Sequence, residues 1–233
     1  MSPRNRIPKV KICGLTTFED AAAAVEAGAD LLGFIFYEKS PRYLEAKQAQ
    51  AIIDELHRIF PVDPQKPRYR TVGVFVNRAA QEIAAIMARA NLDWAQLSGD
   101  EPVGVLQQLQ KRAYKAIRPI AYEVADAEAS FYARYAPRFG PRLLIDAFRP
   151  GEYGGTGHRA DWMLARKVAD DISIILAGGL NPDNVAAAVQ TVRPWGVDVS
   201  SGVEKTPGKK DHDKIRAFVR NAKAAFPTPD HGP

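Results

Sequence analysis

The chain contains a single cysteine, Cys13, and only four histidines among its 233 residues. One cysteine cannot form an intramolecular disulfide, and the histidines are too scattered to supply the ligand spacing of a metal site. No apolar run approaches the ~20 residues that cross a bilayer, and the first eight residues lack the apolar stretch of a secretory signal. We therefore expect a cytoplasmic protein with no metal and no membrane partner.

An excess of charge of one sign is also missing. The formal net charge is +5, and lysine and arginine are spread along the chain without a dense cluster interleaved with aromatic residues. A mild basic excess is usually a solvated surface, and it permits binding of small anions. We expect no nucleic-acid partner. The alternative, a basic protein that binds nucleic acid, predicts an affinity that falls steeply with salt.

Short runs rich in Val, Ile, Leu and Phe recur, each followed by a turn signal and an Ala-rich stretch of helical period. Eight such repeats predict an α/β protein, a single (β/α)₈ TIM barrel over residues 1–233, with residues 1–8 and 227–233 as flexible tails. A doubly wound open sheet is the alternative, but it needs no eighth unit. The predicted strands lie at 9–13, 31–36, 71–76, 94–97, 115–120, 143–147, 173–177 and 196–200. The predicted helices lie at 17–27, 45–59, 79–90, 101–112, 126–135, 160–168, 182–191 and 211–225.

Several helix ends carry local signals. Thr16 or Thr17, followed by acidic residues, predicts an N-cap, and Gly28 predicts a C-terminal stop. Pro182 is expected in the first turn of a helix, where its missing N–H costs nothing. The proline-bearing stretch 61–70 is a polar loop to which we assign no function.

Reactive groups in a barrel gather where the strands end, which makes Cys13 and Asp146 candidates. Cys13 closes one apolar run and Asp146 closes another, whereas a buried inert thiol and a structural carboxylate are the alternatives. Side chains alternate along a strand, so Lys11 and Cys13 share one face, and Asp198 and Ser200 share another. If these faces point into the barrel, the thiol and the carboxyl group converge on one ligand.

Glycine-rich turns follow the last three predicted strands, at 154–157, 178–179 and 200–202. Glycine lets backbone N–H groups approach an oxyanion closely, and barrels often bind phosphate after strands seven and eight. For any single turn, ordinary chain reversal is the alternative. Arg42, after the second strand, could bind a carboxylate in bidentate fashion or lie exposed to solvent. Asn77 and Gln96 are expected as polar residues that line the site. The alternatives are a helix cap for Asn77 and a core amide for Gln96.

The ordered motifs resemble those of the phosphoribosylanthranilate isomerase family of tryptophan biosynthesis. They are KICGLT, GFIFYEKSPR, VGVFVN, QLSGDE, LLIDAF, GGTG, LAGGLNPDNV and VDVSSGVE, from about Val10 to Phe218. The resemblance implies a single barrel that converts N-(5-phosphoribosyl)anthranilate to 1-(2-carboxyphenylamino)-1-deoxyribulose 5-phosphate by an Amadori rearrangement. It implies no cofactor. We expect a monomer or a homodimer, and the sequence does not distinguish the two.

The same resemblance implies roles for individual residues. Cys13 is expected as the general base and Asp146 as the general acid. Arg42 is expected near the anthranilate carboxylate and Asp198 near the ribose. The residues expected to bind the phosphate are Gly155, Gly178, Gly179, Ser200 and Gly202.

Two positions leave questions open. Lys11, or the bound cationic Schiff base, is expected to favour the thiolate of Cys13. A sugar-phosphate aldolase that uses Lys11 as a Schiff-base lysine is a second candidate function, and borohydride trapping distinguishes it. Ser98 stands where the family usually has histidine, so any role that depends on an imidazole there does not carry over.

Overall fold

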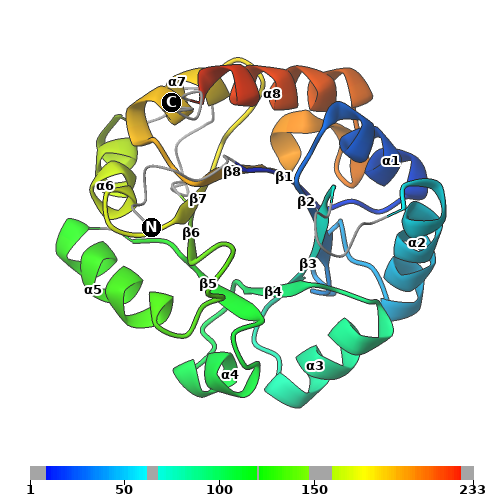
Figure 1. Ribbon diagram of the computed structural model, residues 1–233, viewed down its shortest axis with the longest axis horizontal. Coiled ribbons are helices and arrows are strands. Elements are labelled where there is room, and N and C mark those ends of the chain that lie inside the picture. The colour runs from blue at the N-terminus through cyan, green and yellow to red at the C-terminus, as the bar shows by residue number, and fades with distance from the viewer. Residues whose placement is uncertain (1–8, 62–67, 120, 147–158, 227–233) are drawn as a thin grey trace, which may run out of the picture.

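The computed structural model describes residues 9–61, 68–119, 121–146 and 159–226. Eight parallel strands form a closed barrel in chain order, each hydrogen-bonded to the next, and β8 closes on β1 (Figure 1). The predicted (β/α)₈ barrel is therefore confirmed, and the open sheet is excluded. The strands are β1 (Lys9–Cys13), β2 (Leu31–Ile35), β3 (Arg70–Phe75), β4 (Trp94–Leu97), β5 (Ala113–Ile117), β6 (Leu143–Asp146), β7 (Ile174–Ala177) and β8 (Gly196–Val199).

The helices form a ring outside the barrel (Figure 1). Each follows one strand and returns the chain to the amino end of the next, which is why the strands are parallel. The helices are α1 (Phe18–Ala27), α2 (Ala46–Ile59), α3 (Ala80–Arg89), α4 (Val103–Gln108), α5 (Tyr122–Ala133), α6 (Arg159–Ala169), α7 (Val185–Val192) and α8 (His212–Ala225).

Side-chain alternation along the strands divides the buried residues into two layers. Leu32 and Phe34 belong to the large apolar cluster that packs between barrel and helices, whereas Leu31 belongs to a smaller cluster with Val72 and Leu144. The strand residues of the smaller cluster fill the barrel interior, because they occupy the alternate, inward-facing positions. On each strand, the residues paired in register with Leu31 or Gly33, and every second residue along the strand from them, therefore face the barrel axis.

The predicted helix ends are partly confirmed. The Thr17 hydroxyl accepts a hydrogen bond from the backbone N–H of Asp20 (3.2 Å), and Gly28 ends α1 with a left-handed φ of 91°. Pro182, however, lies in a turn before α7 instead of inside the helix. The Asn181 side chain accepts the backbone N–H groups of the two residues that follow Pro182, which holds this turn.

The elements around β5 were predicted less well. Helix α4 spans six residues instead of 101–112, because Gln110 and Lys111 adopt left-handed backbone angles. Glu101 does not join the helix, since its carboxylate accepts the backbone N–H groups of Asn77 (2.9 Å) and Gly99 (3.1 Å). Strand β5 begins two residues earlier than predicted, and α5 begins at residue 122 instead of 126.

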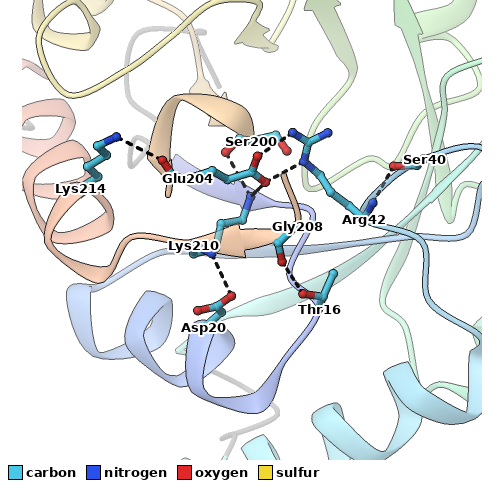
Figure 2. Close-up of polar contacts among 9 residues, drawn as sticks. All are labelled: Thr16, Asp20, Ser40, Arg42, Ser200, Glu204, Gly208, Lys210 and Lys214. Carbon is cyan, nitrogen blue, oxygen red and sulfur yellow. Dashed lines mark hydrogen bonds and ion pairs between the residues drawn. The ribbon is translucent and has the colours of Figure 1, made fainter. Parts of the chain in front are cut away.

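A short hairpin after β8 was not predicted. A 3₁₀ turn at Ser201–Val203 leads into β9 (Glu204–Thr206) and β10 (Lys209–Lys210), which pair antiparallel. The Thr16 hydroxyl donates a hydrogen bond to the Gly208 carbonyl (2.7 Å), so the hairpin turn lies against the loop after β1 (Figure 2). Within the described ranges, no helix has the length and apolarity to cross a membrane.

Candidate active site

A buried polar cluster lies on the inward faces of β1, β4, β5 and β8. The Lys11 ammonium donates to the carboxylate of Asp198 (3.1 Å) and to the side-chain oxygen of Gln96 (2.9 Å), which also accepts from Tyr114 (3.0 Å). Burial alone lowers the pKa of Lys11, but Asp198, Cys13 and Tyr114 together outweigh it, so the pKa is raised. Lys11 is therefore a protonated cation inside the barrel.

Cys13 lies at the end of β1, on the same inward face as Lys11, and is 5% exposed. Burial raises the pKa of the thiol, and the Lys11 ammonium lowers it by a smaller amount. Lys11 therefore favours the thiolate, as predicted, but burial outweighs it in the ligand-free protein. A cation bound beside the thiol would lower this pKa.

Gly33 gives the Cys13 thiol its space. The two residues are register partners on β1 and β2. A Cβ at Gly33 would lie 2.8 Å from Sγ of Cys13 and 3.0 Å from its Cα. The second contact is with backbone, which cannot turn away as a side chain can. Glycine at position 33 is thus required for the observed position of the thiol.

Gly33→Ala is expected to lower kcat by roughly 10–100-fold, since misplacement of a reacting group by about 1 Å has effects of this size. Overpacking should also destabilise the fold by about 1–3 kcal/mol. Steady-state kinetics and urea unfolding measure the two effects. Gly104→Ala in α4 is the matched control, because its added methyl meets no atom within 4 Å. Equal kinetics for Gly33→Ala and wild type would show that the thiol position is not critical.

Asp146 ends β6 and is half-buried, and Arg118 at the end of β5 donates to it (Nε to Oδ2, 3.1 Å). Its carboxylate raises the pKa of Asp198, although burial is the larger cause and Lys11 opposes both. Asp198 in turn raises the pKa of Cys13. Asp198 is thus electrostatically coupled to both predicted catalytic groups, which lie at the carboxyl ends of β6 and β1.

The glycine-rich turns after β7 and β8 lie together. Gly178 and Gly179 both have left-handed φ values, 99° and 64°. A Cβ at Gly202 would overlap the carbonyl oxygen of Leu180, so the two turns contact each other there. The Ser200 hydroxyl is buried and has no hydrogen-bond partner among the described residues. These features suit a bound oxyanion, whereas Gly155 lies outside the described residues.

Arg42 is not a solvated arginine. Its Nε and Nη2 donate to the two carboxylate oxygens of Glu204 at 2.7 and 2.6 Å (Figure 2). A Cβ at Gly14 would lie 2.5 Å from Cδ of Arg42 and 3.0 Å from the Ser200 hydroxyl. The arginine side chain therefore crosses the loop directly after Cys13 and lies near the Ser200 turn.

The polar residues after β3 and β4 shape the neighbouring rim. The side-chain oxygen of Asn77 accepts from the backbone N–H of Asp100 (2.6 Å), so Asn77 fixes the loop after β4. Ser98 accepts from Gln96 (3.1 Å) and lines a cavity of about 420 Å³ together with Lys115 and Arg118. Ser98, the position with the departure noted above, therefore lies at the wall of this cavity.

Sequence reasoning missed Glu204, Lys210 and the Lys115–Glu101 ion pair (2.7 Å). These charges are almost completely buried, whereas a charged residue next to a turn usually predicts exposure. The motif VDVSSGVE contains Glu204, but its partner Arg42 is 162 residues away along the chain. Within the described residues, no group of three or more His, Cys, Asp or Glu side chains could hold a metal ion.

The closed barrel, with ionisable side chains and glycine-rich turns at the carboxyl ends of its strands, places the protein in the class of (β/α)₈-barrel enzymes. The sequence profile of N-(5'-phosphoribosyl)anthranilate (PRA) isomerase matches residues 10–221. The chain therefore belongs to the N-(5'-phosphoribosyl)anthranilate isomerase family, and it is an isomerase.

Relatives and solved structures agree with this assignment. The chain is 44% identical over 219 residues to the N-(5'-phosphoribosyl)anthranilate isomerase of Trichlorobacter lovleyi, covering 94% of this chain and 99% of the relative. The Thermotoga maritima phosphoribosylanthranilate isomerase structure superimposes with a TM-score of 0.79 at 39% identity, covering 94% of this chain and 100% of that one. A second such structure (TM-score 0.77, 37% identity, covering 94% and 100%) contains reduced 1-(o-carboxyphenylamino)-1-deoxyribulose 5-phosphate.

Proposed function

We propose that this protein converts N-(5'-phosphoribosyl)anthranilate to 1-(2-carboxyphenylamino)-1-deoxyribulose 5-phosphate, a step of tryptophan biosynthesis. The observation that carries the proposal is the family match over residues 10–221, which includes every residue of the candidate site. The placement of Cys13, Asp146 and the oxyanion-binding turns at one end of the barrel supports it. No cofactor enters the proposed reaction, since proton transfers alone interconvert substrate and product.

The first chemical step requires an acid. Protonation of the ribose ring oxygen by Asp146 breaks the bond between this oxygen and C1′, and the aryl nitrogen lone pair forms a cationic Schiff base. Arg118, 3.1 Å from Asp146, stabilises the carboxylate that remains after the proton has left. The open-chain sugar then exposes its C2′ proton for removal.

The second step requires a base. Cys13 removes the C2′ proton, and the electron pair neutralises the Schiff base to give an enolamine that tautomerises to the ketone. The positive charge of the Schiff base favours the thiolate, which burial disfavours in the ligand-free protein. Asp198, fixed by Lys11, lies between the two proton-transfer groups in strand order and is proposed to contact the ribose.

The ends of the substrate are held by different loops. The turns at Gly178, Gly179, Ser200 and Gly202 are proposed to bind the phosphate, together with Gly155. The Ser200 hydroxyl, which has no partner in the part of the chain that the structure describes, supplies a donor, and the left-handed glycines let backbone N–H groups face one anion. Arg42 is proposed to bind the anthranilate carboxylate.

Purified protein is expected to consume freshly prepared phosphoribosylanthranilate, followed by the loss of its fluorescence. Formation of the ketose product, which has the same mass as the substrate and is therefore identified by chromatographic co-elution with authentic material, completes the test. A protein that leaves the substrate unchanged would overturn the proposal. Borohydride trapping of a covalent adduct on Lys11 would instead favour the aldolase, although the buried ion pair of Lys11 argues against it.

We further propose that residues 1–233 form one domain, that the protein acts in the cytoplasm, and that it is a monomer or a homodimer. One solved structure of the Thermotoga maritima protein is of monomers generated from a dimeric isomerase, so both states exist among relatives. No part of the chemistry above needs a second subunit.

A further inference from the structure

The starting observation is the way Glu204 contacts Arg42. A guanidinium has two edges that can each bind a carboxylate in bidentate fashion, one formed by Nε and Nη2 and one by the two Nη atoms. Glu204 occupies the first edge with hydrogen bonds of 2.7 and 2.6 Å. No hydrogen bond of Nη1 is found among the described residues, so the second edge has no protein partner there.

Glu204 is itself held rigidly. Lys210 donates to its carboxylate (2.9 Å) and to the carbonyl oxygen of Ser200 (3.1 Å), and both side chains are almost completely buried. Burial alone raises the pKa of Glu204, but its hydrogen bonds to Arg42 and Lys210 outweigh this and lower it. The carboxylate is thus ionised at neutral pH and fixed from two sides (Figure 2).

Arg42 is close to the reacting groups as well as to Glu204. Its side chain passes over Gly14, next to Cys13, and the charge of Cys13 raises the pKa of Arg42, although the hydrogen bond to Glu204 is the larger cause. A long arginine side chain loses rotamer entropy when it becomes fixed. A partner that fixes it before the substrate arrives removes this cost from binding.

We propose that Glu204 is a positioning residue of this enzyme, which holds Arg42 so that its outer edge faces the substrate carboxylate. Lys210 fixes the Glu204 carboxylate and, through the Ser200 carbonyl, ties it to the phosphate-binding turn. The carboxylate end and the phosphate end of the substrate are therefore bound by groups that one buried network holds in fixed relative positions. The inference rests on the proposed function of Arg42, and it goes beyond it by assigning Glu204 and Lys210.

The experiment compares two ligands by isothermal titration. The first is the reduced 1-(o-carboxyphenylamino)-1-deoxyribulose 5-phosphate described above, and the second is the same compound made from aniline, which lacks the carboxylate. Glu204→Gln, which is nearly isosteric, is expected to raise the Kd of the first ligand about tenfold. The Kd of the second ligand should change by less than about twofold, because it does not use Arg42.

A double-mutant cycle tests whether Glu204 acts through Arg42. In Arg42→Ala, which has lost its preference for the carboxylate, adding Glu204→Gln should change neither Kd further. In steady-state kinetics, Glu204→Gln should raise KM with little change in kcat, a split that general destabilisation of the fold would not produce. Asp93→Asn is the matched control, since Asp93 pairs with Arg70 (2.6 Å) at the opposite end of the barrel. It should leave both Kd values unchanged.

Three results would overturn the inference. If Glu204→Gln binds the carboxylate ligand more tightly, Glu204 competes with the substrate for Arg42 instead of positioning it. Equal weakening of both ligands would make Glu204 a support of the phosphate turn alone, and unchanged binding of both would remove its role. If Glu204→Gln does not fold, Glu204→Asp keeps a charge beside Lys210 and should show the same selective loss for the carboxylate ligand. Failure of wild type to isomerise its substrate would instead overturn the proposed function.

Discussion

Cys13→Ala is expected to lower kcat by about 10²–10⁴-fold while the protein stays folded, because a positioned general base contributes an effect of this size. The substitution removes a single sulfur atom, and Cys13 makes no disulfide, so little of the fold depends on it. Stopped-flow and steady-state fluorescence assays measure the loss. A circular dichroism melt close to that of wild type establishes that the variant is folded.

The pH dependence gives a second measurement of the same residue. A general base must be deprotonated, and burial raises the pKa of the Cys13 thiol in the free enzyme. The value of kcat/KM should therefore keep rising with pH beyond ~8.5, the usual thiol pKa. The kcat profile reports the substrate complex, in which the cationic Schiff base favours the thiolate, so its rise should occur at lower pH.

Substrate deuterated at C2′ identifies the step that Cys13→Ala slows. Without the thiol, removal of the C2′ proton becomes rate-limiting, and the isotope effect on kcat should rise towards its full primary value. Near-normal turnover, or a large loss with no isotope effect, would contradict the role of general base for Cys13.

The repeat of apolar strands and Ala-rich helices was sufficient to predict the barrel. In a run such as 31–36, successive side chains point alternately into the barrel and towards the helices. Because both directions lead to buried positions, the run is apolar throughout. The prediction failed where tertiary contacts replaced local preference. Glu101 accepts backbone N–H groups instead of joining a helix, and Gln110 and Lys111 end α4 through left-handed backbone angles.

The candidate site was predicted as a set of strand ends, without its supporting contacts. Cys13 and Asp146 could be found because each closes an apolar run, and strand alternation then gives their direction. The pairing of Arg42 with Glu204 could not be found in this way, since it joins the loop after β2 to a hairpin after β8. Local patterns do not encode which distant loops meet, because closure of the barrel alone brings them together.

The burial of charge explains why these contacts matter. Lys11 and Lys210 are each paired with a buried carboxylate, at 3.1 and 2.9 Å. A buried pair contributes little net stability compared with an apolar core, but loss of one partner leaves an uncompensated charge. Such pairs fix the positions of their members, and here the members are next to the proposed base and phosphate site. The buried charges at the barrel mouth are therefore better explained by the orientation that they give to neighbouring side chains than by a contribution to the stability of the fold.

Asp146→Asn is expected to lower kcat by about 10²–10⁴-fold, because the amide cannot supply the proton that the departing ring oxygen needs. The change preserves the size of the side chain, and Arg118 still has an oxygen acceptor 3.1 Å away in the native position. Asp170→Asn is the matched control, since Asp170 also pairs with an arginine (Arg166, 3.1 Å) but lies beyond the end of α6. It should leave kcat unchanged.

The deuterated substrate then separates the acid from the base. In Asp146→Asn the opening of the ribose ring becomes rate-limiting, so the C2′ isotope effect on kcat should fall towards unity, opposite to its rise in Cys13→Ala. Two variants that lose activity to the same extent would thus respond to deuterium in opposite directions. If both variants showed the same large isotope effect, Asp146 would act after ring opening, and the donor of the first proton would have to be sought elsewhere in the site.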